Sequence, residues 1–181
     1  MNEAGVPFEI DEPGAGPAYL AGDISRRLAS AVIVYGTVRD AGANRYAAEQ
    51  LQSRFLDQRE SAIPIYKDFE VSDELLRRRD VIFVGRPEAN SALAAWAERL
   101  GLDYRGAAFR IGADTHASER EALVWAAKNP LDASHMVLVY AGNDALRTVK
   151  VLNASAGEGQ YVLYEEGKPA RSGFLKAQAA K

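Results

Sequence analysis

Two apolar runs that each stop at a glycine limit most strongly what this chain can fold into. The first is Ala31–Tyr35, followed by Gly36, and the second covers residues 81–84, followed by Gly85. An apolar run rich in β-branched residues and without alternation is typical of a strand covered on both faces, as in a parallel sheet with helices on either side. A loop and a helical pattern follow each glycine. This repetition predicts right-handed crossovers in a doubly wound α/β sheet.

Helical patterns separate and follow these runs. Residues 43–56 place apolar side chains at helical spacing with charged residues opposite, and so predict an amphipathic helix. Its apolar positions are Tyr46 or Ala47, Leu51 and Phe55. Three shorter helices are also expected. One covers residues 72–79 and is capped by Ser72, and a second covers residues 91–100, begins near Pro87 and ends at Gly101. The third covers residues 144–152 and is capped by Asn143 or Asp144.

The pattern changes in the second half of the chain. Residues 108–112, 122–127 and 136–141 form three apolar runs with links too short to hold a full helix. Consecutive strands with short links pair antiparallel, so we expect a mixed sheet, parallel in its first half with antiparallel strands added toward the C-terminal part. Residues 63–66 predict an edge strand, because Pro64 cannot donate to a ladder, and residues 161–165 predict a final strand.

Length and composition predict one domain with irregular ends. The 181 residues are 48% hydrophobic and 26% charged, which suits a single well-buried core. Residues 1–22 are rich in proline and glycine and are interpreted as an irregular lead-in or linker. The α/β domain is expected at residues 23–166, beginning with a helical turn, and residues 167–181 are expected to be a loose tail.

Charge and cysteine content exclude several classes of function. The net charge is -3 and the basic residues are scattered, so we expect no nucleic-acid partner. The chain has no cysteine, which removes disulfides, thiolate metal sites and a cysteine nucleophile. No apolar stretch approaches the roughly 20 residues of a membrane span, so we expect a soluble chain with no membrane partner. A fragment of an exported parent would show the same features, and the compartment is therefore left open.

The motifs of the common cofactor and hydrolase classes are missing from the sequence. The loop at residues 36–44 has neither phosphate-binding glycine pattern, and it lacks the run of hydroxyl residues expected of a flavodoxin phosphate loop. No G-x-S-x-G elbow occurs, and His116 and His135 are expected at the surface, with no metal-ligand spacing. Trp96 and Trp125 are expected in the core. We therefore expect no catalytic residue, no cofactor and no metal.

Polar residues remain at the ends of the predicted strands. Because the carboxyl ends of parallel strands meet at one edge of a sheet, these residues can face a common ligand crevice, in which Arg39 or Arg86 would hold a carboxylate or a phosphate. The other interpretation, which the sequence favours, is that the asparagines satisfy helix ends and turns and that the arginines are solvated. The candidate crevice residues are Gly36, Thr37, Arg39, Asn44, Gly85, Arg86, Asn90, Gly142 and Asn143.

Three segments carry a resemblance to a known family, namely residues 32–37, residues 80–90, and residues 129–131 together with 137–143. Across residues 24–166 the chain resembles the C-terminal flavodoxin-like accessory module of multidomain bacterial hydrolases, which follows an esterase or prolyl-oligopeptidase-like peptidase domain. The resemblance implies that the catalytic residues lie in that preceding domain, that the lead-in is a former interdomain linker, and that the parent is exported. It assigns no role to the recurring positions of the module, which are Gly36, Gly85, Asn90, Gly142 and Asn143.

Two main expectations for function follow from the sequence. The first is a noncatalytic accessory domain of a larger bacterial hydrolase or peptidase, acting in domain packing or substrate access. Its partner would be a hydrolase domain of the same parent chain. The alternative is a standalone domain that binds a small anion or a nucleotide in the strand-end crevice, and an enzyme with an unrecognised site is a weaker third. The oligomeric state is left open.

Overall fold

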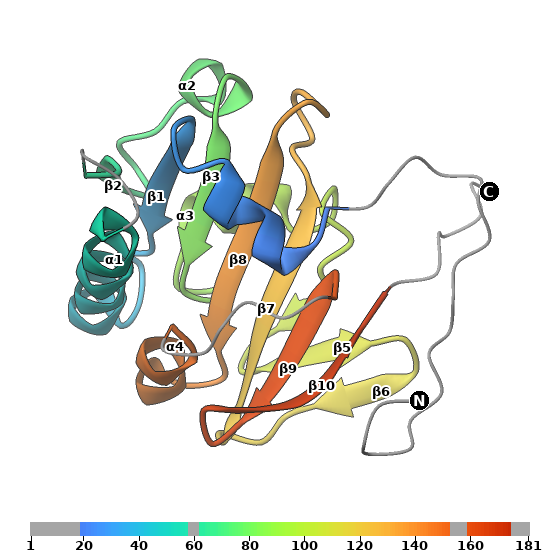
Figure 1. Ribbon diagram of the computed structural model, residues 1–181. Helices are drawn as coiled ribbons and strands as arrows, with labels where there is room; N and C mark the ends of the chain where they lie inside the picture. The colour runs from blue at the N-terminus through green and yellow to red at the C-terminus, as the bar shows by residue number, and fades with distance from the viewer. Residues whose placement is uncertain (1–18, 58–61, 153–158, 175–181) are drawn as a thin grey trace.

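The computed structural model describes residues 19–57, 62–152 and 159–174, and its centre is a seven-stranded sheet (Figure 1). The strands lie in the order β10-β9-β7-β8-β3-β1-β2. Their bounds are β1 (Ala31–Tyr35), β2 (Ile65–Lys67), β3 (Asp80–Val84), β7 (Glu121–Lys128), β8 (Met136–Gly142), β9 (Tyr161–Glu165) and β10 (Lys168–Gly173).

The directions of the strands confirm the expected α/β fold. β1 lies between β2 and β3 and is parallel to both, and β3 is parallel to β8. β7 is antiparallel to β8 and to β9, and β10 is antiparallel to β9. Every residue of β1 and β3 is buried, as a non-alternating apolar strand requires. The molecule therefore has a flavodoxin-like, doubly wound sheet that is parallel in its first half and antiparallel toward the C-terminus.

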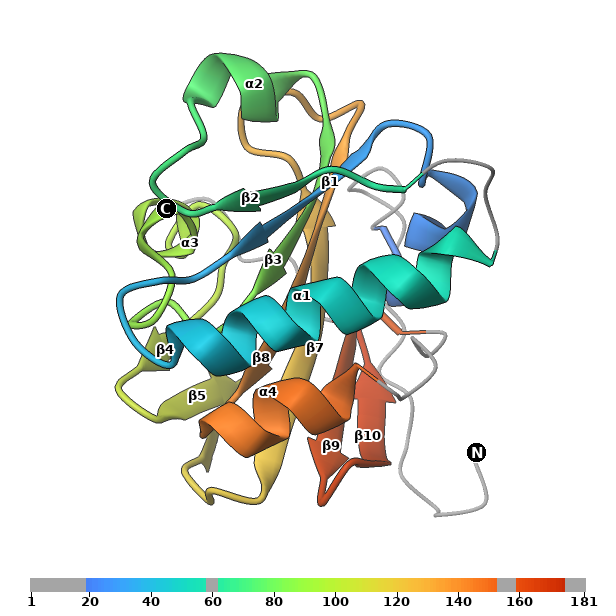
Figure 2. The ribbon, with the colours of Figure 1, turned by 90° about the vertical axis from the view of Figure 1, so that its left-hand side faces the viewer.

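Helices cover one face of the sheet. They are η1 (Ala21–Arg26), α1 (Ala41–Leu56) and α4 (Ala145–Val151). Figure 2 shows α1 and α4 crossing this face. The core between them and the sheet includes Leu51 and Phe55 of α1, Ile33 of β1 and Tyr140 of β8.

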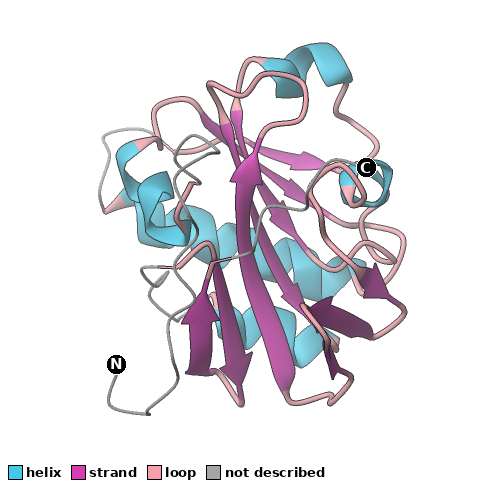
Figure 3. Ribbon diagram, turned by 90° about the vertical axis from the view of Figure 1, so that its right-hand side faces the viewer, coloured by secondary structure: helices cyan, strands magenta, loops and turns pink. Residues whose placement is uncertain are grey.

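The opposite face is covered by two short helices and by a second sheet. The helices are α2 (Asp73–Arg77) and α3 (Ser91–Trp96), and the second sheet consists of β4 (Tyr104–Arg105), β5 (Ala108–Ile111) and β6 (Asp114–His116). The core on this side includes Trp96, packed edge-to-face on Phe83, and Trp125, whose Nε1 donates to the carbonyl of Leu100. Both tryptophans are therefore core residues, as predicted. Figure 3 shows the twist of the main sheet from the side of β9 and β10.

Two strand predictions were wrong. Residues 108–112 do not extend the main sheet, because β5 pairs with β4 and β6 in the second sheet and covers the face of the first. Residues 167–181 are not entirely a loose tail, because β10 pairs with β9 across the turn formed by Glu166 and Gly167. Both turn residues have positive φ angles, 52° and 82°, which permit a tight hairpin. Residues 175–181 lie outside the described residues.

The helices agree with the expected pattern except at their ends. In α1 the buried apolar position is Ala47, while Tyr46 is half exposed. α3 is shorter than expected, since its residues beyond Trp96 form turns that end at Gly101, with φ +67°. Pro87 lies in the turn before Asn90, the N-cap of α3, and not in the first helical turn. η1 begins at Ala21, inside the expected lead-in, of which residues 1–18 lie outside the described residues.

Gly36 ends β1 where a neighbouring loop passes in direct contact. A Cβ atom built on Gly36 would lie 2.2 Å from the backbone carbonyl oxygen of Ala89. No side chain fits at this distance unless one of the two backbones moves. The close approach of the two loops at the carboxyl ends of β1 and β3 therefore depends on this glycine.

We expect Gly36→Ala to lower the free energy of unfolding by about 1–3 kcal/mol, because the added methyl group meets rigid backbone. The matched control is Gly42→Ala in the first turn of α1, where a Cβ would meet nothing within 4 Å. Alanine also favours the helix, so the control should be neutral or stabilising by up to about 1 kcal/mol. Urea unfolding of both variants measures the difference, and equal stabilities would contradict the close packing at Gly36.

Candidate functional site

The carboxyl ends of β1, β3 and β8 lie side by side, because these strands are parallel neighbours. The predicted crevice residues lie in the loops that follow them, in the first turn of α1 and, for Gly142, at the end of β8. The loops after β1, β3 and β8 therefore lie at the same edge of the sheet. What their side chains contact differs from residue to residue.

Asn90 joins two strands and a helix. Its side chain is fully buried, and its Nδ2 donates to the carbonyl oxygens of Val34 in β1 and Val84 in β3, at 3.1 and 3.2 Å. Its Oδ1 accepts from the backbone N–H of Leu93 and so caps α3. The amide thus satisfies backbone groups of three different elements.

Asn44 closes the loop after β1 in a similar way. Its buried Nδ2 donates to the carbonyl oxygens of Gly36 and Arg39, at 3.1 and 3.0 Å. Gly85 faces it from the end of β3, with φ +100°, and a Cβ on Gly85 would lie 3.0 Å from the amide of Asn44. The two asparagines therefore fill the space between the ends of β1 and β3 with internal hydrogen bonds.

Asn143 connects the end of β8 to the second sheet. Its Oδ1 accepts from the hydroxyl of Tyr104 at 2.5 Å, and its Nδ2 donates to the carbonyl oxygens of His116 and Ser118. Burial raises the pKa of Tyr104, so the hydroxyl keeps its proton as a donor. The cap of α4 is Asp144, which accepts from the N–H of Arg147 at 2.6 Å.

Gly142 permits close packing of β8 on α4. A Cβ on this glycine would lie 2.3 Å from the backbone nitrogen of Thr148. The N–H of Gly142 donates to the hydroxyl of Thr148 at 3.0 Å. This glycine therefore has a packing role at the end of β8.

Thr37 contacts a carboxylate that the sequence analysis did not identify. Its hydroxyl donates to Asp68 Oδ1 at 2.6 Å, and Asp68 Oδ2 accepts from the N–H and the hydroxyl of Ser91 at 2.7 and 2.9 Å. Burial acts to raise the pKa of Asp68, but these hydrogen bonds outweigh it and lower the pKa overall. Asp68 thereby links the loop after β2 to the loop after β1 and to the start of α3.

The two candidate arginines differ in their environment. Arg39 is exposed, as the structural interpretation of the sequence expected. Arg86 is not solvated, since only 12% of its side chain is exposed. Its Nη1 lies 3.3 Å from Asp40 Oδ2 and donates to the carbonyl oxygen of Asn143. Arg86 is therefore the candidate cation that lies within this edge of the sheet.

We expect Asn90→Ala to lower the free energy of unfolding by about 1–3 kcal/mol, because it removes the cap of α3 and the buried amide donor to the carbonyls of Val34 and Val84. Ser72→Ala is the matched control. Ser72 caps α2 in the same manner, but at an exposed position, so its loss should cost no more than about 1 kcal/mol. Denaturant unfolding compares the two variants, and equal losses would show that Asn90 acts only as a helix cap.

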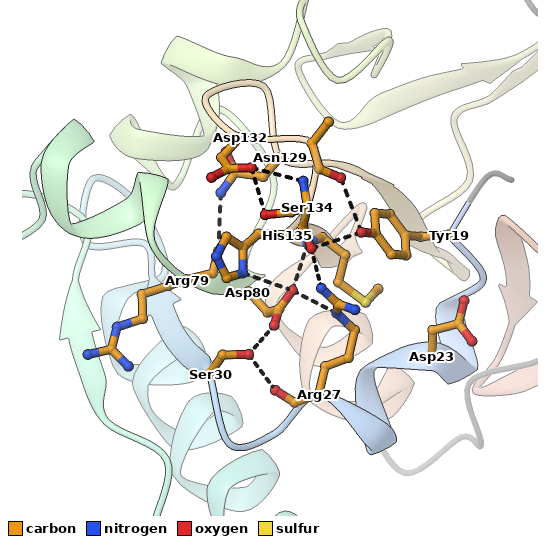
Figure 4. Close-up of polar contacts among 12 residues, drawn as sticks. Tyr19, Asp23, Arg27, Ser30, Arg79, Asp80, Asn129, Asp132, Ser134 and His135 are labelled. Carbon is orange, nitrogen blue, oxygen red and sulfur yellow. Dashed lines mark hydrogen bonds and ion pairs between the residues drawn. The ribbon is translucent and has the colours of Figure 1, made fainter. Parts of the chain in front are cut away.

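A second polar cluster lies at the opposite, amino-terminal edge of the sheet, and the sequence analysis missed it (Figure 4). At its centre Asp80, the first residue of β3, is completely buried. Its carboxylate accepts from Arg27 Nε at 2.9 Å, from the backbone N–H of Met136 at 2.7 Å and from the hydroxyl of Ser30. His135 Nδ1 lies 3.6 Å away. The carboxylate thus joins the starts of β1, β3 and β8.

The residues around Asp80 connect η1 and the β7–β8 turn to this edge of the sheet. Tyr19 donates its hydroxyl proton to the carbonyl oxygens of Ala133 and Ser134, and Arg27 lies over the ring of Tyr19. Burial acts to raise the pKa of Asp80, but the hydrogen bonds from Ser30, Met136 and Arg27 outweigh it and lower the pKa. The geometry is that of a buried, fully bonded carboxylate with a structural role.

We expect Asp80→Asn to lower the free energy of unfolding near pH 7 by about 3 kcal/mol, because Arg27 loses its buried partner. Since the folded state lowers the pKa of Asp80, this stabilisation is present above the unfolded pKa near 3.9 and is lost as the pH falls through the folded value. The difference in the free energy of unfolding between wild type and variant should therefore be smaller at about pH 3 than near pH 7. Urea unfolding at both pH values tests this, and a constant difference would contradict the lowered pKa.

Two shallow hollows lie among the described residues, and these residues form no metal cluster. One hollow of about 350 Å³ lies along the β9–β10 hairpin, and one of about 250 Å³ lies between α2 and α3. Among these residues no group of three or more histidine, aspartate or glutamate side chains is placed to hold a metal ion. The same part of the chain contains no helix with the length and apolar character needed to cross a bilayer.

The two histidines differ in how far they are buried. His116 lies in β6, stacks on Phe109, and places Nδ1 2.8 Å from Glu121 Oε1, while its Nε2 is buried with no hydrogen-bond partner in the described part of the chain. The side chain of His135 is 22% exposed, beside Asp80. The expectation that both histidines are surface residues was therefore wrong for His116.

Comparison of the sequence with protein-family models gives no match. Comparison with curated proteins gives no match either. The geometry of the chain itself is therefore the basis for assigning a function.

Proposed function

We propose that this chain is a noncatalytic accessory domain of a larger bacterial hydrolase or peptidase and acts in domain packing or substrate access. The resemblance described for residues 24–166 supplies the class of the parent, and with it an exported location. The observation that carries the proposal is an apolar surface at the β2 edge of the sheet. Its occupant would be the hydrolase domain of the same parent chain.

The two most exposed large apolar side chains of the described residues lie at this edge. Val38 is 61% exposed and Phe69 is 67% exposed. They follow Thr37 and Asp68, which are hydrogen-bonded to each other, so the two loops that carry them are adjacent. Exposed apolar side chains that lie close together favour a protein-facing surface over free solvent exposure.

The hollow between α2 and α3 extends this surface. Its apolar side chains come from both helices and from the loop before α2, and they are Val71, Leu76, Ala92, Ala95 and Trp96. Its polar residues are Asp68, Ser72, Asp73 and Ser91. We call the surface formed by Val38, Phe69 and Val71 the β2-edge patch. A shallow apolar surface with a polar rim is the anatomy of a protein interface.

The hydrogen bonds at the carboxyl ends of the strands support the same proposal. The amides of Asn44, Asn90 and Asn143 are buried and bonded to backbone or tyrosine groups of the chain itself. These three amides therefore contribute to holding the loops in place. A rigid set of loops is what a docking surface requires.

The test uses the hydrolase region of the parent reading frame, expressed as a separate polypeptide, and measures its association with this chain by calorimetry. Phe69→Ser should weaken association at least about tenfold, since it removes a large apolar anchor. It should change the chain's own stability by no more than about 0.5 kcal/mol, because the side chain is exposed. The matched control is Leu146→Ser on α4, also half exposed but on the opposite face, which should leave association unchanged.

Two results would contradict the accessory role. One is a reading frame that encodes no hydrolase region. The other is an association that Phe69→Ser and Leu146→Ser weaken equally, which would place the interface away from the β2-edge patch.

A further inference from the structure

Arg86 lies at the point where the chain order of the sheet reverses. From β1 the chain runs outward to β2 on one side and then returns to β3 on the other, so the switch point lies between β1 and β3. Arg86 follows β3, and its partner Asp40 lies in the loop after β1. In open α/β sheets a ligand binds outside the carboxyl ends of the strands at such a point.

The guanidinium of Arg86 is held only weakly. Both contacts of Nη1, to Asp40 and to the carbonyl of Asn143, are 3.3 Å long. A well-formed pair between a guanidinium and a carboxylate has about 2.7–2.9 Å between nitrogen and oxygen. The Nε atom of Arg86 is buried and has no hydrogen-bond partner in the described part of the chain. Within the described residues the hydrogen bonds of this guanidinium are therefore long at Nη1 and missing at Nε.

Asp40 is a partner that can be displaced. It occupies the N-cap position of α1 with a left-handed backbone, φ 55° and ψ 27°, and its side chain makes no capping hydrogen bond. About a third of the side chain is exposed. Non-glycine residues in this conformation are uncommon and often mark functional loops. The carboxylate therefore faces Arg86 from a solvent-accessible position.

The charges nearby restrict the kind of ligand. The pKa of Tyr104 is raised first by burial, and the carboxylates of Glu121, Glu88 and Asp144 raise it further while Arg86 lowers it. Arg86 and these carboxylates are therefore close enough to act on the charge of the same hydroxyl. A ligand with several anionic groups would be repelled by them more strongly than a ligand with one such group. A small ligand with one carboxylate, or with one phosphate group, fits this field best.

We propose that Arg86 binds a small oxyanion, a carboxylate or a single phosphate, which takes the place of the Asp40 carboxylate at the guanidinium. The exchange replaces one long contact at Nη1 by a paired contact through two N–H groups of the guanidinium, the geometry that arginine favours for planar anions. No bond is made or broken in the step. The proposal does not rest on the β2-edge patch, so either proposal can hold without the other.

The experiment is a thermal-shift titration of the full chain with acetate and with inorganic phosphate, at constant ionic strength set by chloride. We expect a saturable rise in Tm with one of these anions. Asp40→Asn removes the competing carboxylate and should tighten anion binding roughly two- to fivefold, the range of a partly exposed ion pair. Arg86→Gln should abolish the rise in Tm. Arg45→Gln, which alters an exposed arginine paired with Glu49, should leave it unchanged.

Several outcomes would overturn the proposal. One is that neither anion raises the Tm of the wild type or of Asp40→Asn. This result can be obtained even if the Arg86 variant does not fold. Another is a rise that Asp40→Asn leaves unchanged or weakens, which would show that the Asp40–Arg86 pair only supports the loops. A rise with AMP and none with acetate or phosphate would identify a nucleotide site instead.

Discussion

The hydrogen bonds of Asn90 are the interaction on which the rest of the structure depends most. β1 and β3 are buried on both faces, so the backbone groups at their ends need partners from within the chain. Asn90 supplies one amide donor to each strand and one acceptor to α3. Gly36 allows the loop that carries Asn90 to approach β1 closely enough for these bonds to form.

The fold could be predicted because its signals are local, whereas the polar contacts are not local in sequence. The runs that became β1, β3 and β8 identify buried strands by composition alone. β5 was placed in the wrong sheet because an apolar run does not reveal its partner, although the exposed Arg110 between the buried Phe109 and Ile111 indicates a strand covered on one face. β10 has no apolar pattern at all, and its pairing follows from the turn before it.

The candidate site was predictable in position and not in detail. Asn90 and Asp144 cap helices, as cap residues before an apolar pattern predict, but nothing in the sequence shows that Asn143 bonds to Tyr104, 39 residues away. The Asp80 cluster joins residues about 50 positions apart, so no motif marks it. These contacts bond polar groups at both ends of the strands to the chain itself. The exposed apolar side chains of the proposed docking surface lie instead at the lateral β2 edge.

Hydrogen exchange tests the accessory role most directly. The measurement compares backbone N–H exchange in this chain alone and in the presence of the hydrolase region of its parent. The account predicts slower exchange in residues 37–40 and 67–73, which carry the β2-edge patch, with no change in α4. Protection confined to α1 and α4, or no protection anywhere, would contradict it.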